Sequence, residues 1–166
     1  VNAIWIGDDF GTQTSLIIPP DTFREQLKPI YKRMADKFKQ SKPDIILILH
    51  SDGAVSELLD DIHEIGFDVF NPVQPGVPGH SPQELKNRFG KKFAFWGAID
   101  QQYLLPKGSD KELEEDIIDK IKVLGKDGGY MIAPAHILQN DVRPERVLKF
   151  LELCRKYGEY SKEMIK

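Results

Sequence analysis

Short apolar, β-branched segments alternate along this chain with longer segments in which apolar residues recur every three or four positions. The first pattern predicts buried strands, and the second predicts amphipathic helices. Their alternation is typical of parallel strands joined by crossover helices. Strands are predicted over residues 3–6, 44–49, 69–70, 93–97 and 130–133.

Helix-start signals lie between these strands. Asp21 is a favourable N-cap for the first helix, in which Pro29 is expected to introduce a kink. Ser81 and Ser109 each open a capping box, because a glutamate follows each serine three residues later. The last helix is predicted to begin near Pro144. The chain therefore contains about five βα units.

A chain of 166 residues is long enough for one domain with a buried core and too short to argue for two. Five βα units fit an open doubly wound sheet, and they also fit the later part of an eight-stranded barrel, which five parallel strands cannot close. The chain starts directly in a strand-like segment and without methionine, so we expect it to be truncated.

The composition of the chain indicates which partners are not expected and where in the cell the protein is expected. The 26 acidic and 23 basic residues nearly balance and form no long block, so neither a nucleic acid nor a membrane surface is expected as a partner. Cys154 is the only cysteine, and it is predicted to be buried in a helix face. The longest apolar run, residues 45–49, is far shorter than the roughly twenty residues of a membrane helix. We expect a soluble, cytoplasmic protein.

Polar residues follow each predicted strand, at the edge where parallel α/β folds place their active sites. His50 and Asp52 are two residues apart on an extended segment, so their side chains share a face. His136 ends the fifth strand and is placed to face them across the mouth of a barrel. Two imidazoles and one carboxylate can bind zinc or ferrous iron and leave positions open for a substrate atom. A histidine hydrogen-bonded to aspartate, without metal, is the alternative interpretation.

Each of the other polar strand ends also has a structural explanation, because Asp, Asn and Gly satisfy the backbone at turns. Asp8 and Asp9 point in opposite directions on a strand, so one of them is expected to brace a loop. His63 and His80 are predicted at the solvated surface. The chain has no dinucleotide-binding glycine motif, phosphate loop or Gly-x-Ser-x-Gly elbow, so these chemistries are unsupported.

Five short motifs carry a family resemblance. In chain order they are Gly7-Asp8-Asp9-Phe10-Gly11-Thr12-Gln13, Leu49-His50-Ser51-Asp52-Gly53, Phe70-Asn71-Pro72-Val73-Gln74, Trp96-Gly97-Ala98-Ile99-Asp100 and Pro134-Ala135-His136. In order and spacing the chain resembles the C-terminal half of the uroporphyrinogen decarboxylase superfamily, which also contains corrinoid-dependent methyltransferases. The resemblance implies an α/β fold, namely the C-terminal part of a TIM-type (β/α) eight-stranded barrel, with residues 1–166 as a single domain and the N-terminal half absent.

The residues at the second and fifth strand ends bear on the subfamily. The methyltransferases that the chain resembles hold zinc with a His-x-Cys-Gly motif and a later cysteine. Asp52 stands at the first cysteine position here, and His136 stands at the later one. The resemblance therefore implies a metal site of His50, Asp52 and His136, whose harder ligands suit activation of oxygen better than of a thiol. Decarboxylases resemble the chain at Asp52, Gly53 and His136 but lack His50, and they need no cofactor.

The resemblance favours a metal-assisted methyltransferase that moves a methyl group between a corrinoid carrier and a small substrate. Zinc is the expected metal, and a corrinoid protein is an expected partner. Uroporphyrinogen decarboxylation is the first alternative, and a non-catalytic half-barrel subunit is the second. Exposed strand edges predict a homodimer. The expected catalytic and metal-binding residues are His50, Asp52 and His136, and the expected substrate-binding residues are Asp8, Asp9, Gln13, Asn71, Gln74, Asp100 and Gln101.

Overall fold

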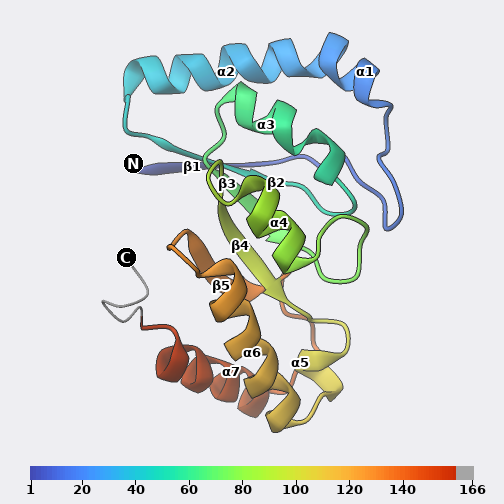
Figure 1. Ribbon diagram of the computed structural model, residues 1–166, viewed down its shortest axis with the longest axis vertical. Helices are drawn as coiled ribbons and strands as arrows, with labels where there is room; N and C mark the ends of the chain where they lie inside the picture. The colour runs from blue at the N-terminus through green and yellow to red at the C-terminus, as the bar shows by residue number, and fades with distance from the viewer. Residues whose placement is uncertain (160–166) are drawn as a thin grey trace.

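The computed structural model describes residues 1–159 and contains one sheet of five parallel strands (Figure 1). All five predicted strands are present, and the third is longer than predicted because it continues through Asn71 and Pro72. The register between the third and fourth strands shifts after Phe70, where this proline enters the strand. The strands are β1 (Ala3–Gly7), β2 (Ile46–His50), β3 (Val69–Val73), β4 (Ala94–Ile99) and β5 (Tyr130–Pro134).

The order of the strands distinguishes between the two predicted architectures, a doubly wound sheet and part of a barrel. They pair in chain order, β1-β2-β3-β4-β5, and every neighbouring pair is parallel. A doubly wound sheet reverses its strand order at a switch point, whereas a (β/α) barrel adds each strand beside the previous one. The observed order therefore excludes the doubly wound sheet and confirms the prediction of part of a barrel.

Helical segments occupy the connections between the strands, as predicted. No helix within residues 1–159 is long and apolar enough to cross a membrane. The segments are α1 (Pro20–Thr22), the π-helical η1 (Phe23–Leu27), α2 (Lys28–Ser41), the 3-10 helical η2 (Ser56–Leu58), α3 (Leu59–Ile65), α4 (Pro82–Phe89), α5 (Leu104–Lys107), α6 (Asp110–Leu124) and α7 (Pro144–Tyr157).

The start of the first helix differs from the prediction. Helix α1 begins at Pro20, so Asp21 lies in its first turn, and the prediction of Asp21 as N-cap is wrong. The irregularity expected at Pro29 takes the form of the π-helical turn before it, in which the Lys28 N–H donates to the Phe23 carbonyl. Proline has no N–H for the ordinary helical hydrogen bond, and its ring crowds the preceding turn.

The two predicted serine caps start α4 and α6. Ser109 accepts a hydrogen bond from the Glu112 N–H at 3.2 Å, and the Glu112 carboxylate accepts one from the Ser109 N–H at 2.7 Å, which completes a capping box. At α4, Ser81 accepts from the Glu84 N–H at 3.3 Å, and the return bond is not formed. Both helices therefore begin where the sequence predicts.

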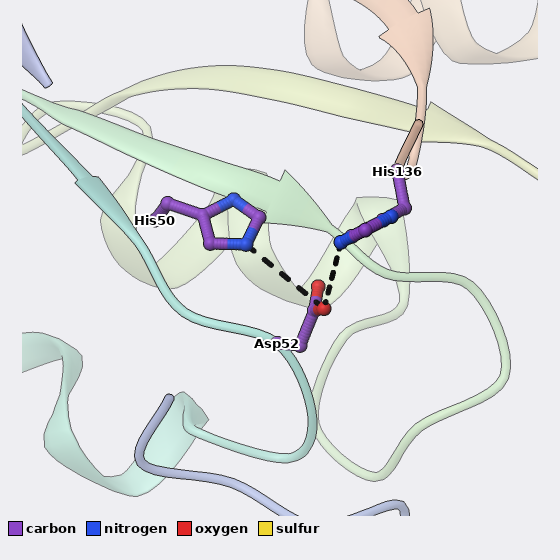
Figure 2. A group of neighbouring side chains, drawn as sticks. All are labelled: His50, Asp52 and His136. Atoms are coloured by element: carbon purple, nitrogen blue, oxygen red, sulfur yellow. Dashed lines mark ion pairs between the residues drawn. The ribbon is translucent and has the colours of Figure 1, made fainter. Parts of the chain in front are cut away.

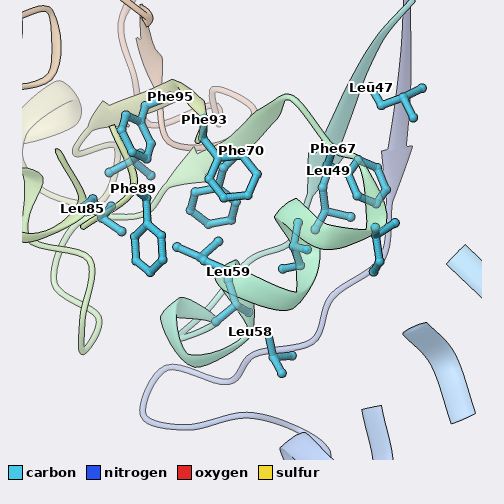
Figure 3. Close-up of a cluster of buried hydrophobic side chains, with 14 of the residues drawn as sticks. Leu47, Leu49, Leu58, Leu59, Phe67, Phe70, Leu85, Phe89, Phe93 and Phe95 are labelled. Carbon is cyan, nitrogen blue, oxygen red and sulfur yellow. The ribbon is translucent and has the colours of Figure 1, made fainter. Parts of the chain in front are cut away.

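The main core lies between the sheet and helices α2, α3 and α4. Leu47 and Leu49 of β2 point into it together with Phe70 of β3 and Phe95 of β4, and all four side chains are fully buried (Figure 3). Burying one such side chain contributes about 1.5–3 kcal/mol. Phe89 of α4 closes the cluster from the helix side. This core fixes the strands whose carboxyl ends carry the polar residues.

A second cluster packs α5, α6 and α7 beside β4 and β5. Cys154 of α7 was predicted to be buried in a helix face, and it lies at the edge of this cluster, partly buried. Burial raises the pKa of the Cys154 thiol to about 11, so the thiol remains protonated at neutral pH. This cysteine is therefore a packing residue.

The other face of the sheet is open. Trp5 is 58% exposed, Met131 51% and Ile46 44%. Strands β1 and β5 pair with no further strand within residues 1–159. In a closed barrel this face forms the packed interior. A homodimer would cover these free edges and this apolar surface. The homodimer stays a prediction.

His80 is buried, and its predicted position at the surface is wrong. Its side chain, in the loop between β3 and α4, is 2% exposed and stands edge-on to Phe70 at a centroid distance of 5.5 Å. Neither ring nitrogen has a hydrogen-bond partner among residues 1–159. The loop packs so closely on the segment before α3 that a Cβ at Gly79 would lie 2.0 Å from the Ser56 hydroxyl oxygen. His63 is exposed, as predicted.

We expect this buried imidazole to make the protein less stable in mild acid. Burial lowers the pKa of His80 to about 4. Between pH 6.5 and 4 the unfolded chain binds a proton that the folded chain does not, so stability falls through this window and levels off below it. The loss from this group reaches about 2 kcal/mol at pH 5. Urea unfolding of H80L at pH 7.5 and pH 5 measures it: the variant should lose about 2 kcal/mol less than wild type between these two values. The control H63L, at an exposed site, should lose as much stability between pH 7.5 and pH 5 as wild type does. Equal losses of stability in H80L and H63L would contradict the prediction.

Candidate metal centre

Three predicted residues meet at one point beyond the carboxyl ends of the strands. His50 is the last residue of β2, Asp52 follows it by two positions, and His136 comes two residues after β5. The Asp52 Oδ2 atom lies 3.9 Å from His50 Nε2 and 3.5 Å from His136 Nε2 (Figure 2). One ligand atom from each residue lies within 4.8 Å of the other two, and this is the one such group of three found among residues 1–159.

The distances favour a shared ion over direct hydrogen bonds. Hydrogen bonds between nitrogen and oxygen span about 2.7–3.2 Å, so 3.5 Å and 3.9 Å are too long. Ligand atoms bound at about 2.0–2.2 Å to a tetrahedral zinc ion are separated by about 3.3–3.5 Å. The three ligand atoms lie within 4.8 Å of one another, so they would move closer together to bind one ion. The side chains of His50, Asp52 and His136 are 15%, 31% and 35% exposed, so the group is partly accessible to solvent.

Asn71 fixes the proton on His50. The His50 Nδ1 atom lies 2.7 Å from Asn71 Oδ1, which can only accept a hydrogen bond, so Nδ1 carries the proton. The Nε2 lone pair is then free to face Asp52. This contact arises because His50 and Asn71 are register partners in β2 and β3. A metal-binding histidine commonly has such a partner on its other nitrogen, which fixes its orientation. Asn71 was predicted to bind substrate, and the structure places its side chain against His50 Nδ1, where it also lines a hollow beside the strands.

The loop that carries Asp52 is held by its backbone. The Asp52 N–H donates to Asp9 Oδ1 at 2.9 Å, and the Gly53 N–H donates to Gln74 Oε1 at 2.8 Å. Gly53 has a φ of +84° and lies against Gly11 of the neighbouring loop, where an added Cβ would come within 2.4 Å of the Gly11 carbonyl carbon. These contacts fix the Asp52 backbone and leave its carboxylate free.

Asp8 and Asp9 both accept hydrogen bonds from other segments of the fold. The Asp9 side chain accepts the Asp52 N–H, and the Asp8 carboxylate accepts a hydrogen bond from the Tyr31 hydroxyl of α2. Burial, with Asp8 beside it, raises the pKa of the Tyr31 hydroxyl well above its usual range, so this group remains a donor. One of the two aspartates was expected to brace a loop, and the structure shows that both connect neighbouring segments.

A polar pocket with a cavity volume of about 430 Å³ opens beside Asp52 and His136. It contains four of the predicted substrate-binding residues, whereas Asp8, Asp9 and Asn71 do not line it. Gln102 also lines it and was not predicted, although it directly follows Gln101. The lining residues are Gln13, Asp52, Gln74, Pro75, Gly76, Asp100, Gln101, Gln102, Ala135 and His136.

An apolar hollow lies on the other side of the histidines, on the open face of the sheet. Its volume is also about 430 Å³, and Trp5 and Trp96 contribute its aromatic walls. The Trp5 ring stands edge-on to the His50 ring, with 5.1 Å between centroids. Both tryptophans were missed as site residues, because the sequence alone did not show that their face of the sheet adjoins the histidines. His136 borders both the polar pocket and this hollow.

Family comparison agrees with the motifs and the strand order. The family model for uroporphyrinogen decarboxylase (URO-D) matches residues 1–157. The chain belongs to the uroporphyrinogen decarboxylase family. This confirms the resemblance inferred from the five motifs. The predicted URO-D fold is also found among solved structures: a methyltransferase from Methanosarcina mazei aligns with a TM-score of 0.72 at 18% identity, over 95% of this chain and 43% of that one. That likeness shows the fold.

Curated relatives are similar in sequence over most of this chain. It is 28% identical over 153 residues to "Uroporphyrinogen decarboxylase" of Hordeum vulgare and, over the same length, 28% identical to "Uroporphyrinogen decarboxylase 2, chloroplastic" of Arabidopsis thaliana. The matches cover 92% of this chain, 43% of the Hordeum protein and 36% of the Arabidopsis protein. The chain therefore spans less than half the length of these URO-D relatives.

Proposed function

We propose that this URO-D family member is a metal-assisted methyltransferase, which moves a methyl group between a corrinoid carrier and a small substrate. The observation that carries the proposal is the convergence of His50, Asp52 and His136 at the spacing of metal ligands. We propose zinc as the metal, because two imidazoles and a carboxylate with an open fourth position match a catalytic zinc site.

The chain's own residues prepare this site before any substrate arrives. Asn71 directs the His50 Nε2 lone pair toward Asp52. Asp9 and Gln74 hold the loop that positions the Asp52 carboxylate. A bound divalent ion would supply Lewis acidity, which polarises a substrate oxygen, nitrogen or sulfur atom. Because the ligand set contains no thiolate, it favours a hard substrate atom.

The two cavities suggest separate binding places for the small substrate and the methyl carrier. The polar pocket beside Asp52 and His136 would orient the small substrate through Gln13, Gln74 and Asp100. The apolar hollow between Trp5 and Trp96 would receive the methyl carrier's less polar surface. His136 borders both cavities, so the group in transfer would pass beside it. A corrinoid protein and a second copy of this chain are the partners we propose.

Porphyrinogen decarboxylation is the second candidate function, because the curated relatives named above are uroporphyrinogen decarboxylases. In that case Asp52 and His136 would hydrogen-bond the pyrrole or carboxylate groups of the substrate, and no metal would be needed. The difference between the two candidates is therefore measurable: one needs a metal and consumes methylcobalamin, and the other does neither.

The test is to measure zinc content by elemental analysis and then to incubate the protein with methylcobalamin and a panel of alcohols, amines and thiols. We expect about one zinc per chain and a change in the cobalamin absorption spectrum as the methyl group leaves. H63A, which removes an exposed histidine outside the site, should behave like wild type in both measurements. A metal-free protein that leaves methylcobalamin unchanged with every acceptor would overturn the proposal.

A further inference from the structure

The polar pocket has an unbalanced set of charges. Two carboxylates, those of Asp52 and Asp100, line it, and it contains no lysine or arginine side chain. The other polar lining groups are four glutamine amides and the His136 imidazole. A pocket that binds carboxylate, sulfonate or phosphate groups normally presents cationic side chains to them. The wall that this chain contributes is therefore unsuited to an anionic substrate.

The Asp100 carboxylate is held in position by backbone N–H groups and has no ion-pair partner within residues 1–159. Its Oδ1 atom accepts hydrogen bonds from the Gln102 N–H at 2.7 Å and from the Tyr103 N–H at 3.3 Å. Asp100 forms no ion pair with any residue in 1–159, in contrast to Asp61, which is bound by both Arg24 and Lys28. The fold thus neutralises a carboxylate within the helix layer and leaves the pocket carboxylate for a ligand.

The amide groups of the pocket also favour a hydrogen-bond donor. Gln101 Oε1 is buried and has no hydrogen-bond partner within the described chain. Gln74 accepts a hydrogen bond from the Gly53 N–H and donates one of its two amide N–H groups to Gln13 Oε1. A buried carbonyl oxygen without a partner is costly unless a donor reaches it. Because Gln101 Oε1 has no exposed surface, a ligand N–H or O–H group reaches it only if the Gln101 side chain turns toward the pocket.

We infer that the polar pocket selects a small amine in its ammonium form, with a lone-pair atom at its other end, and discriminates against anions. An ammonium group has three N–H donors and a positive charge, so it matches the Asp100 carboxylate, which lines the pocket without an ion-pair partner in residues 1–159. The lone-pair atom lies toward His136 and Asp52. The inference rests on the proposed function only in treating this pocket as the substrate's place.

Three probes of one shape test the inference. Ethanolamine, ethylene glycol and isethionate share a hydroxyethyl group and carry a cationic, neutral or anionic end. Each is titrated into isotope-labelled protein while the amide NMR signals of Gln101 and Gln102 are followed. Ethanolamine should bind about tenfold more tightly than ethylene glycol, as expected for one charge across a partly solvated pocket, and isethionate should bind least. Comparable binding of all three probes, tighter binding of isethionate, or no shift with any probe would overturn the inference.

Asp100→Asn isolates the charge. Asparagine Oδ1 can still accept the Gln102 and Tyr103 N–H groups, so the turn and the fold are retained. We expect the ethanolamine advantage over ethylene glycol to fall to about twofold or less. The matched control Asp44→Asn, at an exposed carboxylate paired with Lys42, should leave the advantage unchanged. An unchanged advantage in Asp100→Asn would also overturn the inference.

The titrations are made on metal-free and on zinc-treated protein, which separates this inference from the proposed function. If zinc does not bind and the preference for ethanolamine persists, the metal-assisted function fails and the substrate class stands. If zinc binds and the preference is absent in both forms, the substrate class fails and the metal centre stands.

Discussion

Asp52→Ala is expected to weaken zinc binding about a thousandfold, since it removes one of three protein ligands from a site whose binding energy is shared among them. Asp52 is the most informative ligand to remove, because its Oδ2 atom is the common neighbour of both histidine nitrogens. The fold should tolerate the change, since the loop at this position is fixed through the Asp52 and Gly53 N–H groups. The same variant should lose methylcobalamin demethylation.

Competition titration with a zinc-chelating dye measures the affinity. Asn71→Ala provides an intermediate case, because it keeps all three ligand atoms and removes only the hydrogen bond to His50 Nδ1. Loss of such a supporting contact costs about tenfold to a hundredfold in metal affinity. Asp44→Ala, at an exposed carboxylate outside the site, should bind zinc as wild type does. Equal affinities for Asp52→Ala and Asp44→Ala would show that these side chains do not form a metal site.

The convergence of His50, Asp52 and His136 was predictable because parallel strands end at one edge of a sheet. In either parallel architecture the ends of β2 and β5 lie at the same edge, and in a barrel the curvature of the sheet brings them toward each other across the mouth. The strand order was not predictable from hydrophobic periodicity, which reports burial and says nothing of which strand pairs with which. The observed pairing in chain order identifies this edge as part of the mouth of a barrel, and two cavities open beside it.

The hydrogen-bond partners of Asp8, Asp9 and Asn71 could not be predicted, because each partner lies far away in the sequence. Asp8 bonds to Tyr31, and Asp9 bonds to the Asp52 backbone. Asn71 meets His50 only through the register of β2 and β3. The burial of His80 has the same origin, since its Pro/Gly-rich loop looks solvated locally and folds back onto Phe70. Sequence therefore identified the polar edge, and long-range contacts divided its residues between support and site.

Gly53→Ala is expected to destabilise the protein by about 2–5 kcal/mol, which would be a large part of the stability of a typical domain. Two effects add. A left-handed backbone costs an alanine about 1–2 kcal/mol, and Gly53 has a φ of +84°. In addition, the new Cβ would lie 2.4 Å from a backbone carbon of Gly11 and 2.5 Å from the Thr12 carbonyl oxygen, and forcing such backbone apart costs about 1–3 kcal/mol more.

Gly128→Ala separates the two effects. Gly128 has nearly the same φ, +83°, and an added Cβ there would meet nothing within 4 Å. Its cost in urea unfolding should therefore be the strain alone, about 1–2 kcal/mol. Gly53→Ala should also weaken zinc binding, because the displaced loop carries Asp52, whereas Gly128→Ala should leave it unchanged. If the two variants lose equal stability and both keep wild-type zinc affinity, the contact between the Gly11 and Gly53 loops does not position the metal centre.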